Sequence, residues 1–204
     1  MSALVCVFIP LWTFLQKNTH IRNCSGYIEG MTLMSITIRP EVESDYGQIT
    51  DVIDQAFAGK PYAGGDESDL VIKLRELDAL TLGLVAESGG AFAGHIAFSP
   101  AAAEDGTEGW FALGPVAVYP QFQSVGIGGK LINEGLKQIK KLGAIGCMLT
   151  GNPDYYLRFG FGFSPNNVPT TESAAYFMMK RLNQAPLPLG PMAFHPAFYG
   201  ASDD

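Results

Sequence analysis

Apolar and polar positions alternate over residues 35–40, which is the pattern of a half-buried strand. The next apolar residues recur at helical spacing: Ile49, Val52, Ile53, Ala56 and Phe57. Ser44 is the expected N-cap of this helix and Gly59 its expected end. A second helix is predicted over residues 69–77. Two β-like runs follow, 79–88 and 91–100, and the Gly89-Gly90 pair between them predicts a hairpin.

The second half of the chain continues the same alternation of strands and helices. Residues 110–120 are apolar at successive positions, as in a strand covered on both faces. A long amphipathic helix is predicted from Ile127 to Leu142, with Gly143 at its end. A buried strand over 144–150 precedes a short helix, for which Asn152 is the expected cap and Pro153 the first residue. Extended structure is predicted again over 161–165 and 190–198.

This order of elements predicts an α/β layered fold with a mixed sheet and helices on its faces. We expect a single domain over residues 35–200. We interpret residues 1–34 as an N-terminal extension. Residues 2–16 are apolar and uncharged, whereas the first predicted strand of the domain begins at residue 35. Either the start is assigned too early, which we favour, or the extension is a membrane-associated or partner-binding arm. Its apolar run is shorter than the about 20 residues of a membrane span.

Composition narrows the classes of function. The 204 residues carry a formal net charge of −7, which argues against a protein that coats nucleic acid and is compatible with a cationic substrate. Three cysteines and three histidines are scattered, so no metal site is expected and a reduced, cytoplasmic protein is the simplest interpretation. Cys147 falls within a predicted strand and is not expected to be a nucleophile.

The most informative stretch is "QSVGIGGKL", residues 123–131, a glycine-rich turn between a strand and a helix. The phosphate loop of nucleotide hydrolases fails here, because Ser124 and Leu131 stand at two of its required positions. The dinucleotide fingerprint fails at Leu131 as well. The pattern Q/R-x-x-G-x-G/A is met by Gln123, Gly126 and Gly128. Such a turn lets backbone N–H groups and a helix N-terminus surround a pyrophosphate.

Two segments in the right order resemble the GNAT superfamily of N-acetyltransferases, in particular a bacterial branch of predicted acetyltransferases. "LGPVAVYPQFQSVGIGGKLI" is similar to its acetyl-CoA-binding segment, and "GNPDYYLRFGF" resembles its second signature. The resemblance covers about residues 35–200. It implies the acyl-CoA N-acyltransferase fold, with a mostly antiparallel sheet of about 6–7 strands. It further implies acetyl-CoA as co-substrate and direct transfer to an amine, without a metal or a covalent enzyme intermediate.

The resemblance also implies roles for individual residues. The backbone N–H groups of Val116, Ala117 and Val118 would meet the pantetheine and the acetyl oxygen, with Val118 as the oxyanion donor. Tyr156 stands where the general acid is found, with Tyr155 as its rival, and both tyrosines are expected to contact the cofactor. Asn152 is a helix cap, a cofactor contact or both. The implied pyrophosphate loop comprises Gln123, Ser124, Val125, Gly126, Ile127, Gly128, Gly129 and Lys130.

This loop departs from the pattern of the superfamily in its charge. Ser124 and Val125 occupy positions where Arg or Lys is frequent, and the first basic residue is Lys130. The loss of one exposed phosphate contact is expected to cost about 1 kcal/mol of binding.

The general base and the acceptor stay open at this stage. Loop carboxylates are candidate bases, although a chain of water molecules would serve equally: Asp66, Glu67, Asp69, Glu104, Asp105 and Glu108. The acceptor would be a primary amine of a small molecule or of a protein N-terminus or lysine, and a homodimer is possible. The alternative functions are a catalytically silent domain that senses acyl-CoA and a membrane-tethered protein.

Overall fold

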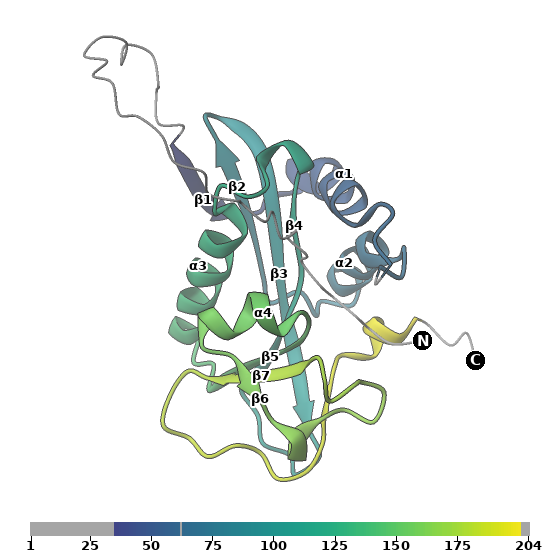
Figure 1. Cartoon of the computed structure of the whole chain (residues 1–204), viewed down its shortest axis with the longest axis vertical. Coiled ribbons are helices and arrows are strands. Elements are labelled where there is room, and N and C mark those ends of the chain that lie inside the picture. The colour runs from purple at the N-terminus through teal and green to yellow at the C-terminus, as the bar shows by residue number, and fades with distance from the viewer. Residues whose placement is uncertain (1–34, 62, 201–204) are drawn as a thin grey trace, which may run out of the picture.

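A computed structural model describes residues 35–61 and 63–200, so the predictions for the 1–34 extension lie outside the described residues. In the described part of the chain, eight strands form the central sheet (Figure 1). In spatial order along the main path they are β1 (Ile36–Pro40), β2 (Leu82–Ser88), β3 (Ala91–Ala103), β4 (Trp110–Val118), β5 (Gly146–Thr150), β7 (Phe177–Arg181) and β6 (Gly162–Phe163). The short β8 (Met192–Ala193) pairs with the far end of β3.

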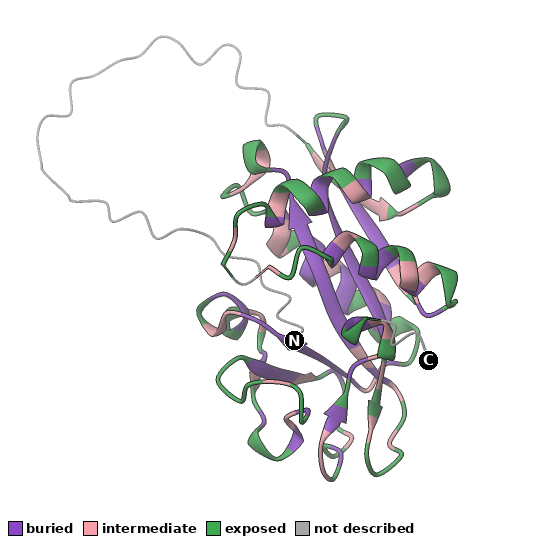
Figure 2. Ribbon diagram, turned by 90° about the vertical axis from the view of Figure 1, so that its right-hand side faces the viewer, coloured by how far each residue is buried: buried purple, intermediate pink, exposed green. Residues whose placement is uncertain are grey.

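The helices cover both faces of this sheet (Figure 1). On one face lie α1 (Tyr46–Phe57) and α2 (Glu67–Glu76), and on the other lie α3 (Ile127–Lys141) and the single-turn α4 (Pro153–Tyr156). The strands between them are buried along most of their length, whereas the outer sides of the helices are exposed (Figure 2). No helix in the described residues is long and apolar enough to cross a membrane.

Within the described part of the chain, every strand pair is antiparallel except β4–β5, which is parallel. The predicted hairpin at Gly89-Gly90 is confirmed, because β2 and β3 pair on either side of it. The predicted mixed, mostly antiparallel sheet flanked by helices is therefore confirmed. The parallel pair requires a crossover connection, and α3 supplies it.

The long helix α3 lies close against the sheet. Its apolar stripe is buried as the spacing predicted, with Leu131, Ile132 and Ile139 fully covered. A Cβ on Gly135 would lie 2.3 Å from the ring of Phe98, so only a glycine allows the helix to approach this strand so closely.

Some predicted elements were wrong. Strand β7 was missed, although its first residues are fully buried between β5 and β6. The last predicted strand shrinks to β8, after which Pro196–Tyr199 forms a 3₁₀ turn. Ser44 is not the cap of α1: a 3₁₀ turn, Glu43–Asp45, precedes the helix, and the Asp45 carboxylate accepts the Val42 N–H at 2.8 Å.

The second helix was predicted to begin two residues too late. The α2 helix begins at Glu67, and the side chain of this residue binds the backbone of the preceding loop. Its carboxylate accepts the N–H groups of Gly64 at 2.7 Å and Gly65 at 3.1 Å.

Candidate functional site

The central strands β4 and β5 part halfway along their length. They pair at three positions, from Trp110 opposite Gly146 to Ala112 opposite Met148, and no further. On the other side of β4 the register with β3 shifts between Phe98, opposite Leu113, and Ile96, opposite Val116. The extra residue therefore lies on β4, which is a bulge in this strand. From the bulge to its end, β4 is paired on the β3 side only.

The N–H groups at the end of β4 point alternately to the two sides. The Tyr119 N–H donates to the Ala93 carbonyl at 3.0 Å. Because bonded pairs alternate along an antiparallel ladder, Ala117 faces β3 with its N–H, and Val116 and Val118 face the side where β5 has parted. The backbone thus offers two donors towards the opening between these strands.

The glycine-rich turn follows directly after β4. A 3₁₀ turn, Pro120–Phe122, leads into Ser124 with φ +65° and Gly126 with φ +90°. The side-chain amide of Gln123 donates to the Val118 carbonyl at 2.9 Å and so fastens the turn to the strand. The α3 helix begins here without a side-chain cap. Its first N–H groups and the positive end of its dipole are therefore available to an anion.

The short helix α4 carries two tyrosines and contacts this turn through Tyr155. The Asn152 side chain accepts the Asp154 N–H at 3.0 Å, which confirms its predicted capping role. The Tyr155 hydroxyl would lie 2.8 Å from a Cβ on Gly128, so the α3 N-terminus and α4 touch. Tyr156 is fully buried, and its ring packs edge-on against Tyr155 with 5.1 Å between centroids.

The surroundings of Tyr155 keep its hydroxyl protonated near pH 7. Burial raises the pKa of its hydroxyl, and the Arg158 guanidinium beside it opposes this only in part. Arg158 itself was not singled out from the sequence. Its guanidinium carbon lies 4.1 Å from the centroid of the Tyr155 ring and 5.0 Å from that of Phe159. A basic residue close in sequence to aromatic residues is too common a pattern to have indicated this position.

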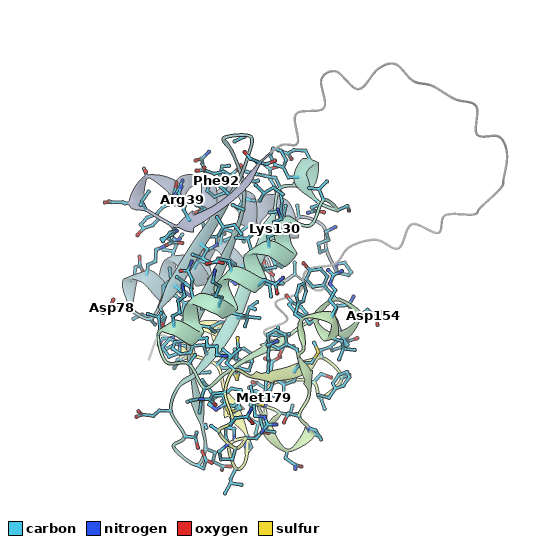
Figure 3. The ribbon with its side chains drawn as sticks, turned by 90° about the vertical axis from the view of Figure 1, so that its left-hand side faces the viewer. Arg39, Asp78, Phe92, Lys130, Asp154 and Met179 are labelled. Carbon is cyan, nitrogen blue, oxygen red and sulfur yellow. The ribbon has the colours of Figure 1, made fainter. Side chains whose placement is uncertain are left out.

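The predicted site residues do not all gather at one place. The side chains of Val118 and Tyr155 both lie next to Gly128. The other predicted residues of the glycine-rich turn are neighbours of Gly128 in the sequence. Lys130 instead lines a groove of about 560 Å³ between α3 and β1, together with Ile36 and Lys137. Figure 3 shows Lys130 on α3 and Asp154 on α4 from this side of the molecule.

The loop carboxylates are poorly placed to act as bases. Glu104, Asp105 and Glu108 lie in the β3–β4 connection, at the opposite end of β4 from Val118. Nine residues of strand separate the two ends, a length of roughly 26 Å. The Glu67 carboxylate is occupied by the two loop N–H groups it accepts.

Just after the end of β4, Tyr119 pairs with Asp51 on α1. The Tyr119 hydroxyl donates to Asp51 Oδ2 at 2.6 Å. Burial, together with the negative charge and hydrogen bond of Asp51, raises the pKa of Tyr119 to about 12. This contact joins residues 68 positions apart, and no local pattern indicates it.

Cys147 is fully buried on β5. Burial raises the pKa of its thiol far above the usual range, so no thiolate nucleophile is available there. In the described residues, no group of three His, Cys, Asp or Glu side chains could hold a metal ion.

Away from the turn, a largely buried cluster joins three segments: Glu41 after β1, Arg75 on α2 and His95 on β3. The Glu41 carboxylate accepts the Arg75 Nε–H at 2.8 Å and lies 2.7 Å from His95 Nε2. Burial alone would raise the pKa of Glu41, but the bonds from His95 and Arg75 outweigh it and hold the pKa below its usual value. Burial lowers the pKa of the fully enclosed His95. The imidazole is therefore neutral near pH 7, and its Nε2–H donates to Glu41.

This cluster makes folding stability sensitive to acid. The unfolded chain binds a proton at this histidine below about pH 6.5, whereas the folded chain binds it only at lower pH. The melting temperature is therefore expected to fall as pH is lowered from about 6.5 to 5, corresponding to up to about 1.4 kcal/mol per pH unit for this one group. Thermal unfolding of the parent and of His95→Gln, followed at several pH values, tests this.

The variant should show a flatter pH dependence in this window. His195→Gln removes a half-buried histidine elsewhere and serves as the control. An equally steep fall of the melting temperature in His95→Gln would refute the assignment.

Three comparisons with known proteins agree with this geometry. The sequence profile of the Acetyltransferase (GNAT) family matches residues 49–161. The chain is 33% identical over 151 residues to the uncharacterized N-acetyltransferase YhbS of Escherichia coli K12, covering 71% of this chain and 86% of the relative. A GNAT family acetyltransferase from Brucella melitensis, solved in complex with acetyl-CoA, has 43% identity and a TM-score of 0.70 over 81% of this chain and 99% of its own. The structure of Escherichia coli YhbS in complex with CoA has 27% identity and a TM-score of 0.76, over 84% and 96% of the two chains.

Proposed function

The chain belongs to the acetyltransferase (GNAT) family, and from this premise we propose that it transfers the acetyl group of acetyl-CoA to a primary amine by direct attack in a ternary complex. The observation that carries the proposal is the parting of β4 and β5 beside an uncapped, glycine-rich helix N-terminus. The solved relative from Brucella melitensis is in complex with acetyl-CoA, which supports acetyl-CoA as the co-substrate here.

The described residues fit the two ends of this co-substrate. The Val116 and Val118 N–H groups would hold the pantetheine arm and the acetyl oxygen, since their partner strand has left them. Ala117 lies between them with its own N–H turned to β3. The turn from Gln123 to Gly129 would surround the pyrophosphate with backbone donors, because a Cβ on Gly126 would meet nothing within 4 Å and the space is open.

The chemistry assigns one task to each group. The neutral amine nitrogen forms a bond to the acetyl carbon, and negative charge develops on the acetyl oxygen, where the Val118 N–H stabilises it. The carbon–sulfur bond then breaks, and Tyr156 donates its hydroxyl proton to the departing thiolate. The nitrogen loses its proton to solvent water, and water returns a proton to the Tyr156 phenolate. Among the candidate bases, Glu104, Asp105 and Glu108 lie at the far end of β4, and Glu67 accepts two loop N–H groups. Asn152 holds the first turn of α4 and thereby places Tyr156.

The acceptor is proposed to be a cationic amine in its resting form. The chain has 20 acidic against 13 basic residues, so an ammonium group is attracted to the protein before it loses its proton. A polyamine, an aminoglycoside and the N-terminus or a lysine of a protein all satisfy this chemistry.

Calorimetric titration of the purified chain with acetyl-CoA is the first test. We expect binding in the micromolar range, with a dissociation free energy of about 8 kcal/mol. Release of free thiol from acetyl-CoA is then followed with spermidine, with kanamycin and with a lysine-containing peptide. Absence of binding would contradict the proposal. Binding without acetylation of any amine would favour the alternative, a silent domain that senses acyl-CoA.

A further inference from the structure

The turn at the α3 N-terminus carries no positive side chain. Residues 123–129 include neither Lys nor Arg, and Lys130 lines the groove on the β1 side of α3. The nucleotide end of coenzyme A carries a pyrophosphate and a 3′-phosphate, each of them anionic. The chain has a net charge of −7, so its overall field repels these phosphates. Without a positive side chain, backbone N–H groups alone would have to offset this repulsion.

Arg158 is the basic residue that the fold brings to this place. It lies in the 3₁₀ turn Leu157–Phe159, which continues α4. Its guanidinium stacks over the Tyr155 ring at 4.1 Å and lies 5.0 Å from the Phe159 centroid. The same two rings contact the first turn of α3: the Tyr155 hydroxyl would lie 2.8 Å from a Cβ on Gly128, and Phe159 would lie 3.5 Å from one on Gly129. One pair of rings therefore links the guanidinium to the helix N-terminus.

The guanidinium is exposed, and the Tyr155 hydroxyl is a polar group beside it. Arg158 is exposed, and it takes part in none of the ion pairs among residues 35–61 and 63–200. Stacking on two aromatic rings restricts its rotamers, so little side-chain freedom is lost when an anion binds. The planar fork of N–H donors matches phosphate oxygens in a way that an ammonium does not.

We propose that Arg158 binds a phosphate group of the nucleotide end of acyl-CoA and provides the positive side chain that the glycine-rich turn lacks. The proposal rests on the function above, because it concerns the same cofactor site. It assigns the turn Leu157–Phe159 to cofactor binding, whereas the neighbouring Tyr156 acts at the thioester end.

The test compares the affinities of the parent and of Arg158→Gln for three ligands by calorimetry. The ligands are acetyl-CoA, acetyl-3′-dephospho-CoA and acetyl-pantetheine, which lacks all three phosphates. We expect roughly five- to tenfold weaker acetyl-CoA binding by the variant, the effect of one partly exposed charge-assisted bond. Acetyl-pantetheine should bind parent and variant equally. If the weakening persists with the dephospho ligand, Arg158 binds the pyrophosphate; if it vanishes, Arg158 binds the 3′-phosphate.

Two further variants keep the result interpretable. Arg158→Lys retains the charge and should lose less affinity than Arg158→Gln. Lys141→Gln removes the same charge from an exposed site at the other end of α3, roughly 20 Å away, and should bind like the parent. Equal affinity of parent and Arg158→Gln for acetyl-CoA would overturn the proposal and leave the proposed function intact. Failure of the parent itself to bind acetyl-CoA would instead contradict the proposed function.

Discussion

Tyr156→Phe is expected to lower the rate of acetyl transfer by about 10²- to 10³-fold, the range for loss of a general acid. The departing thiolate would then have to take its proton from water. The ring itself should stay in place, because it is fully buried and packs edge-on against Phe161 with 5.9 Å between centroids. Affinity for acetyl-CoA should stay within about twofold of the parent, so the loss appears in kcat. Steady-state kinetics with the best amine of the acceptor screen, together with calorimetry, separate the two quantities.

Tyr155→Phe is the matched control, because it removes the neighbouring hydroxyl from the same helix. This hydroxyl lies beside Gly128 in the first turn of α3, so the change should act on acetyl-CoA affinity more than on kcat. If Tyr156→Phe retained full kcat and Tyr155→Phe lost it, the roles of the two tyrosines would have to be exchanged. If neither variant lost activity, no tyrosine of α4 would be the acid.

The second large effect is expected from Gly126→Glu. This glycine has φ +90°, a conformation that costs an L-residue roughly 1–2 kcal/mol. The new carboxylate would lie in open space within the turn and would repel the pyrophosphate from the helix N-terminus. Acetyl-CoA affinity should fall by about 100-fold or more, since both donors and charge are affected. Calorimetry of the folded variant measures this directly.

Gly106→Glu separates the effect on binding from the effect on folding. Gly106 has φ +77°, and a Cβ there would also meet nothing within 4 Å. It lies in the β3–β4 connection, at the opposite end of β4 from the turn. The variant thus carries the same strain and the same charge, and it should lose a similar amount of stability while binding acetyl-CoA like the parent. Similar loss of affinity in both variants would indicate that unfolding, and not the turn, explains the result.

Much of the fold could be predicted because its signals are local. The helical spacing of Leu131, Ile132 and Ile139, the Gly89-Gly90 hairpin and the cap at Asn152 each depend on residues within a few positions of one another. Strand β7 was missed for a physical reason: both its faces are buried, so its run of apolar residues does not alternate. It also lies among prolines, which indicated an irregular tail.

Of the candidate site, the sequence indicated the chemistry, and the family resemblance indicated which residues carry it. Gly126 and Gly128 could be singled out because a close backbone approach to an anion favours glycines spaced closely within one turn. The direction of the N–H groups at Val116 and Val118 could not be predicted. This direction depends on the register of β4 with β3 and on the residue after which β5 no longer pairs with β4. Both β3 and β5 lie outside the motif.

Contacts between distant segments arose only when the chain folded. Arg158 reaches the α3 N-terminus through Tyr155 and Phe159, although the two segments are separated by a strand. Glu41 meets His95 across 54 positions of sequence, and Tyr119 meets Asp51 across 68. Local periodicity specifies which face of an element is buried, but it carries no information about which other element will cover that face. For this protein the sequence therefore determined most of the elements, the glycine-rich turn and the class of ligand that we propose, and the packing of the helices on the sheet determined which side chains surround the turn.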